Sequence, residues 1–112
     1  MADTAGEDER EVRLKAALWF AVGKIVDEES IKQGCNATPQ FIGALTEMVW
    51  AQIESVAGDL ESFSRHARRT TVSTDDVVLL ARKNPDLLDI VRGFVDEKKA
   101  DKQKKGKNKE KR

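Results

Sequence analysis

The sequence predicts an all-α fold of four helices: a medium helix, a very long helix, a short helix and a C-terminal helix. Apolar residues recur at steps of three and four positions through most of residues 9–97, which is the spacing of one helix face. The chain has only two prolines, and each follows a residue that can cap a helix, in the pairs Thr38-Pro39 and Asn84-Pro85. Both prolines therefore mark helix starts.

The first helix is expected over residues 9–29. The residues that form its apolar face are Leu14, Leu18, Ala21, Val22, Ile25 and Val26. The stretch "SIKQGCNATP" then breaks the pattern, because Gly34 and Asn36 favour a loop and Thr38 can cap the next helix.

The second helix is expected over residues 39–67, and its apolar face is continuous. That face consists of Ile42, Leu45, Val49, Ile53, Val56, Leu60 and Phe63. A helix of this length extends about 43 Å, whereas a globule of 100 residues has a radius of gyration of only about 13 Å. One short chain cannot cover such a helix, so we expect the face to form the interface with a partner chain.

A short run after the long helix combines several signals. Arg68 and Arg69 precede "TTV", whose β-branched composition is typical of an extended segment. Ser73 and Asp76 form an S-x-x-D signature of a helix start. The third helix is expected there. A fourth follows Pro85, with an apolar face of Leu87, Leu88, Val91, Phe94 and Val95.

The net charge of zero conceals a separation of charge along the chain. Residues 1–11 carry a net charge of −4, residues 12–97 a net charge of −3, and residues 98–112 a net charge of +7. We expect an acidic disordered arm over residues 1–10, a folded domain over residues 11–97, and a basic disordered tail over residues 98–112. The tail either binds phosphate backbones, acts as a nuclear-import signal or only aids solubility.

Several function classes lack support in the sequence. No apolar run approaches the roughly 18 residues of a membrane span. Cys35 is the single cysteine and is interpreted as an incidental free thiol, while His66 is the single histidine, so we expect no disulfide, no zinc site and no other metal. No phosphate-gripping glycine loop or Ser–His–Asp set is present, and we therefore expect neither a cofactor nor an enzyme.

Two quoted runs carry a resemblance to a known family. "HARRTTVSTDDVVLLAR" at residues 66–82 looks like the histone segment that joins the long helix to the last core helix, and the helix order is that of a histone fold. Together with "RLKAALWFAVGKI" at residues 13–25, this run resembles the centromere protein S family. The resemblance covers about residues 12–84, and it predicts a histone fold with an additional C-terminal helix.

The resemblance implies roles for single residues. Arg69 and Asp76 occupy the positions of an intrachain clamp, with phosphate contact as the alternative for Arg69. Val72 lies in a loop that pairs with a partner chain as a short strand, beside the helix caps. The DNA-facing edge would comprise Arg13, Lys15, Lys32, Arg65, Arg68 and Arg69, although solvation alone also explains isolated surface lysines. His66 would make a dimer-to-dimer contact, with plain surface exposure as the alternative.

The resemblance also implies a function and a set of partners. It implies a non-enzymatic, nuclear, DNA-binding subunit that pairs with a smaller histone-fold partner like centromere protein X, with a 2:2 tetramer as the expected assembly. The complex would bind double-stranded or branched DNA, support a helicase like that of Fanconi anaemia group M at stalled forks, and act in kinetochore assembly with other centromere histone-fold dimers. The alternative is a histone-fold platform in a transcription complex with little DNA contact of its own, which the negative charge of residues 12–97 favours.

Overall fold

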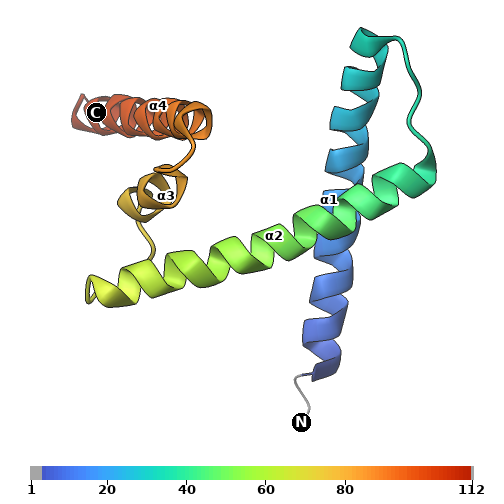
Figure 1. The fold of residues 1–112 in the computed structure, drawn as a ribbon. Coiled ribbons are helices and arrows are strands. Elements are labelled where there is room, and N and C mark those ends of the chain that lie inside the picture. Colours follow the sequence, from blue (N-terminus) through green and yellow to red (C-terminus); the bar gives the residue numbers. More distant parts are fainter. Residues whose placement is uncertain (1–3, 112) are drawn as a thin grey trace. The chain divides into compact units, whose positions relative to one another are not determined.

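A computed structural model describes residues 4–111, and it contains four helices (Figure 1). These are α1 (Thr4–Gln33), α2 (Pro39–His66), α3 (Thr74–Ala81) and α4 (Pro85–Glu110). The order confirms the predicted all-α class. The chain forms two compact units, which divide α2 after Ser55, and each unit is described by itself.

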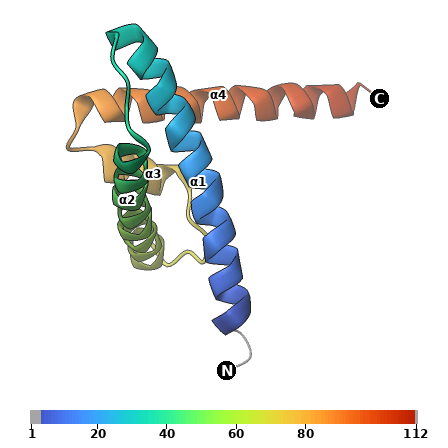
Figure 2. The ribbon, with the colours of Figure 1, turned by 90° about the vertical axis from the view of Figure 1, so that its right-hand side faces the viewer.

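In the first unit, α1 crosses the beginning of α2 (Figures 1 and 2). Gly23 of α1 faces Ile42 of α2 at this crossing: a Cβ built on Gly23 would lie 3.7 Å from Cγ2 of Ile42, an ordinary van der Waals contact. Val22 and Thr46 are buried beside it. The Thr46 hydroxyl donates a hydrogen bond of 2.7 Å to the Ile42 carbonyl, so its burial leaves no unpaired polar group.

The first loop begins with a left-handed residue. Gly34 has φ +68°, a conformation that glycine adopts without steric cost. The Cys35 N–H donates to the Ser30 carbonyl at 3.1 Å, and the Gly34 N–H donates to the Ile31 carbonyl at 3.4 Å. These two bonds form a Schellman motif that ends α1. At the other end of the loop, the Thr38 hydroxyl accepts a hydrogen bond of 3.1 Å from the Phe41 N–H at the start of α2.

The same motif ends α2, but without a glycine. The Arg69 N–H donates to the Ser64 carbonyl at 2.8 Å, and the Arg68 N–H donates to the Arg65 carbonyl at 2.9 Å. Arg68 occupies the left-handed position with φ +60°. A side chain in this region costs about 1–2 kcal/mol relative to a right-handed conformation, so the chain holds an arginine where glycine fits better.

In the second unit, α3 and α4 pack against each other across a short connection. Ala81 is buried at the end of α3. The Asn84 side chain then caps α4 by accepting a hydrogen bond of 3.1 Å from the Leu87 N–H, and Pro85 occupies the first helical turn. The segment "TTV" forms no strand within residues 4–111, although the backbone of Ser73 is extended.

The two expected disordered arms are helical where the structure describes them. Residues 4–10 belong to α1 and residues 98–110 belong to α4; residues 1–3 and 112 lie outside the described residues. Neither segment contains proline, and both are rich in good helix formers. The charges also suit the helix dipole, since Glu7 lies in the first turn of α1 and Lys107 and Lys109 lie in the last turn of α4.

We expect Arg68→Gly to raise the free energy of unfolding by up to about 1 kcal/mol, because it removes the left-handed strain. Gly34→Ala should lower the free energy of unfolding by about 1–2 kcal/mol, since it introduces the same strain at the end of α1. Urea unfolding followed by circular dichroism measures both changes. A destabilised Arg68→Gly variant would show instead that contacts of the arginine side chain hold the loop.

Candidate partner and nucleic-acid interfaces

The chain buries little apolar surface within itself. Among residues 4–111 the only buried apolar residues are Val22 and Ala81, and no large side chain is fully buried. Large apolar side chains are instead exposed on all four helices, among them Phe20, Met48, Leu79 and Phe94. Surfaces of this kind mark association sites.

No residue of the expected partner face of α2 is fully buried. Ile53 near its middle and Val72 in the following loop are each 45% exposed. The other members are partly exposed, and none is buried; they are Ile42, Leu45, Val49, Val56, Leu60 and Phe63. Ile42 differs from the rest because it also meets Gly23 at the crossing with α1.

An apolar hollow of about 600 Å³ lies where α1 ends and α2 begins. Ile25 and Val26 line it from α1, while Phe41 and Leu45 line it from α2. The free thiol of Cys35 lies at its wall and is exposed. The hollow extends the apolar surface of the first unit beyond the α2 stripe that the sequence identified.

The residues that follow α2 are held by a two-pronged ion pair. Arg69 donates from Nη1 to Oδ2 of Asp76 at 2.9 Å and from Nη2 to Oδ1 at 2.6 Å. Nη1 also donates to the Thr71 carbonyl at 3.0 Å. The Asp76 carboxylate in turn accepts from the Ser73 N–H at 2.9 Å, which caps α3. One carboxylate thus joins the loop to the helix start.

This geometry shifts the pKa of both ionisable groups. The hydrogen bonds from Arg69 and then from the Ser73 N–H lower the pKa of Asp76 from 3.8 to about 2. The same hydrogen bond to Asp76 raises the pKa of Arg69. The Asp76 side chain is 4% exposed, whereas that of Arg69 is 36% exposed. Arg69 is therefore committed to protein acceptors and is poorly placed to serve a phosphate.

The two neighbouring arginines, Arg65 and Arg68, are more exposed than Arg69. The Arg65 side chain is 77% exposed and makes only a long ion pair of 3.5 Å with Glu61, of a kind that contributes little in water. Arg68 is exposed, and no ion pair holds its side chain within the described part of the chain. These two side chains form a pair of exposed cations at the end of α2, beside a fixed loop.

Lys15 is not a free cation. Its Nζ lies 3.5 Å from Oε2 of Glu47 and 3.8 Å from Oε1 of Glu11, and 5.4 Å from the ring centre of Trp50. The Trp50 ring N–H donates to Glu54 at 2.9 Å. Sequence analysis missed the contacts with α2 because they exist only where α1 crosses α2. The Glu11 pair alone, at a spacing of four residues, was visible in the sequence.

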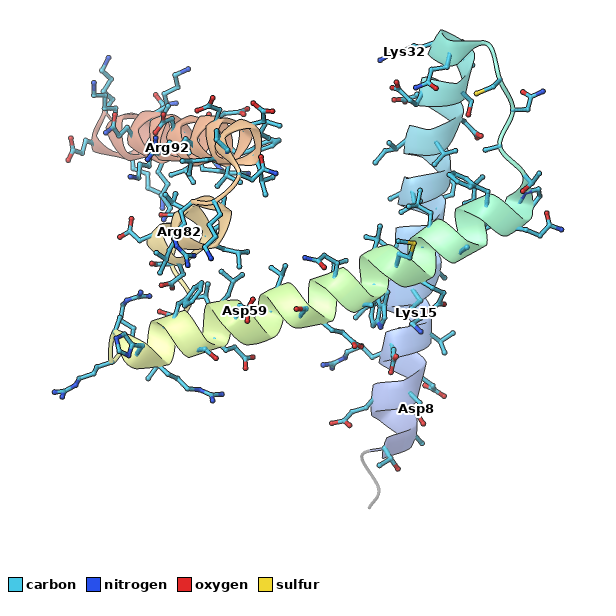
Figure 3. All side chains as sticks on the ribbon, in the orientation of Figure 1. Asp8, Lys15, Lys32, Asp59, Arg82 and Arg92 are labelled. Atoms are coloured by element: carbon cyan, nitrogen blue, oxygen red, sulfur yellow. The ribbon has the colours of Figure 1, made fainter. Side chains whose placement is uncertain are left out.

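The remaining α1 cations do not converge on one site. Arg13 and Lys32 are both exposed, but 19 positions separate them along the same helix, or about 28 Å. Figure 3 shows Lys32 near the end of α1, far from Lys15. His66, the last residue of α2, is exposed. Across residues 4–111, no three metal-binding side chains form a cluster, and no helix in that range is apolar and long enough to span a bilayer.

The first helix is longer than the expected medium helix, since α1 has 30 residues and α2 has 28. The order of the helices and the two loops, with an Arg69–Asp76 pair joining the second loop to the third helix, is that of a histone fold. A solved chain supports this class. The structure of the Saccharomyces cerevisiae MHF complex contains a chain that matches 76% of this chain and 97% of its own length, with a TM-score of 0.72 and 36% identity.

Sequence comparisons identify the family. Residues 12–87 match the family described as CENP-S protein. Centromere protein S of Mus musculus is 47% identical over 76 residues, which is 68% of this chain and 54% of the relative. The inner kinetochore subunit MHF1 of Saccharomyces cerevisiae is 37% identical over 81 residues, which is 72% of this chain and 90% of the relative. The chain belongs to the centromere protein S family, and it spans about half the length of the mouse and human relatives that it matches.

We expect Asp76→Asn to lower the melting temperature at neutral pH, because the Arg69 ion pair is lost. A lowered carboxylate pKa stabilises the fold fully above about pH 4, and this stabilisation disappears as the pH falls to about 2. The difference between wild type and Asp76→Asn should therefore shrink over that range. Thermal melts at several pH values measure it, with the exposed neighbour Asp75→Asn as control. A difference that stays constant down to pH 2 would rule out the charged pair as its source.

Proposed function

We propose that this chain is a non-enzymatic histone-fold subunit that pairs with a smaller histone-fold partner of the centromere protein X type. The single observation that carries the proposal is the exposed apolar face of α2, with Ile53 at its middle. A large apolar surface without a cover within the chain favours an obligate partner over a transient one. The S. cerevisiae neighbour was solved as a complex, which is consistent with pairing. We expect a 2:2 tetramer, with His66 at the contact between dimers.

The proposed complex binds double-stranded or branched DNA through the exposed end of α2. Arg65 and Arg68 support this role because both side chains are exposed, whereas the Arg69–Asp76 pair keeps the loop in place. Arg13 and Lys32 remain additional candidates, and Lys15 is a weaker one because two carboxylates neutralise it. Since residues 12–97 carry net negative charge, binding should be salt-sensitive and shared with the partner.

The proposed site of action is the nucleus, at centromeres and kinetochores, with a second role at stalled replication forks beside a helicase of the Fanconi anaemia group M type. The name of the yeast relatives, inner kinetochore subunit, supports the first role. Other centromere histone-fold dimers are further expected partners. A transcription-complex platform is the second candidate, favoured by the net charge of −3 on residues 12–97.

The mass of the purified chain tests the pairing. We expect light scattering to give a defined heterodimer or 2:2 tetramer after co-expression with a centromere protein X-like partner, and an aggregated or poorly folded chain alone. Ile53→Asp should abolish assembly because it places a charge in the apolar face. Ala51→Asp, on the opposite side of α2, is the matched control. A stable helical monomer that ignores the partner would overturn the proposal.

Replacing both Arg65 and Arg68 with alanine tests the DNA surface. We expect the assembled complex to form normally, with its slope of log affinity against log salt shallower by up to about 1.8, because each phosphate contact contributes about 0.9. Fluorescence anisotropy with a duplex probe measures the change. Lys24→Ala with Arg92→Ala removes the same charge elsewhere and should leave the slope close to wild type. Unchanged DNA affinity in the Arg65 and Arg68 double variant would favour the transcription platform.

A further inference from the structure

Half of the lysines at the basic end of α4 lie on one face of the helix. Four of its lysines follow steps of 4, 3 and 4 residues: Lys98, Lys102, Lys105 and Lys109. In a helix with about 100° per residue, these four side chains fall within an arc of about 60°. We call them the lysine stripe. The four other lysines of the segment, Lys99, Lys104, Lys107 and Lys111, leave the helix at least about 80° from the centre of that arc.

The lysine stripe continues the half-buried face of α4. Leu88, Val91 and Val95 mark that face, since each is partly buried in a helix that packs on α3. At residue 98 the same face changes from apolar to basic. Figure 2 shows α4 running on well past α3, so the lysine stripe has no cover within the second unit. All four lysines are exposed, and no ion pair engages any of them among residues 4–111.

We propose that the lysine stripe of α4 is a second phosphate-binding surface, which holds the backbone of duplex DNA independently of Arg65 and Arg68. Along the helix the stripe is about 16 Å long, and a duplex of that length carries about ten phosphates. Lysine suits such a surface because its ammonium group binds a phosphate as a point charge and reads no base edge.

The composition of residues 98–111 favours duplex DNA over a membrane surface or a protein partner. A helix that lies on a membrane needs apolar or aromatic side chains to insert, and this segment has no apolar residue larger than Ala100. An interface with a protein partner derives most of its energy from buried aromatic or apolar anchors, and this segment offers none. The phosphate backbone requires only spaced positive charge. The inference shares DNA association with the function proposed above, but it does not depend on the loop.

Two matched variants of the full chain, assembled with its partner, test the lysine stripe. One replaces Lys98, Lys102, Lys105 and Lys109 with glutamine; the other replaces Lys99, Lys104, Lys107 and Lys111. Both remove four charges and keep good helix formers. We expect the stripe variant to raise the Kd for a duplex of about 40 base pairs at least about tenfold at about 0.1 M salt, and to make the salt slope shallower by about 2 to 3.6. The off-stripe variant should change Kd by less than about threefold.

A third variant separates geometry from charge. Ala100→Pro keeps every lysine but interrupts the helix, and therefore the alignment of the stripe. We expect it to weaken duplex binding in the same direction as the stripe variant. Equal losses of duplex affinity in the two lysine variants would overturn the proposal, because the segment would then act by charge alone. Unchanged duplex affinity in both variants would also overturn it.

Two further measurements distinguish a failure of the lysine-stripe proposal from a failure of the proposed function. If the stripe variant loses binding to phosphatidylserine vesicles and keeps its duplex affinity, a membrane surface replaces DNA as the ligand and the proposal fails. The Arg65 and Arg68 double variant is measured in parallel. Loss of duplex binding in that variant alone would overturn the lysine stripe and leave the proposed function intact.

Discussion

The shortage of buried apolar surface is the constraint on which the rest of this structure depends. A helix of 28 residues extends about 42 Å, and only α1, α3 and α4 are available to cover it. Burial of apolar area supplies most of the stability of a fold, yet Val22 and Ala81 alone are buried apolar residues within the described range. Most apolar side chains of the described range are therefore not buried by the chain itself, and they form the surface that the proposed partner would cover.

A second dependence lies in the turn from α2 into α3, over residues 67–73. Arg69 acts twice there: its backbone N–H completes the Schellman motif with Ser64, and its guanidinium holds Asp76. Arg68 is thereby fixed in a left-handed conformation while its side chain stays exposed. A substitution of Arg69 therefore changes both the turn and the basic surface. A substitution of Arg68 changes the basic surface and leaves the Arg69–Asp76 pair in place.

The sequence was a sound guide wherever a feature depends on local spacing. Helix order, the starts at Pro39 and Pro85 and the capping of α3 by Asp76 all follow from patterns within a few positions of the chain, and family resemblance added the pairing of Asp76 with Arg69. Sequence was a poor guide to contacts across helices: the Lys15–Glu47 ion pair joins residues 32 positions apart, where α1 crosses α2. At the two charged ends the lack of apolar residues predicts disorder, while helix propensity and the helix dipole favour the helices that the structure shows there.

The helical C-terminal segment changes how a chain of zero net charge can meet a polyanion. A disordered tail of charge +7 would surround a phosphate backbone from all sides and lose conformational entropy on binding. A helix has already lost that entropy, and it presents part of its charge on one face. The negative charge of residues 1–97 opposes DNA binding. In the proposed complex, the direction in which the lysines leave α4 therefore matters more than their number.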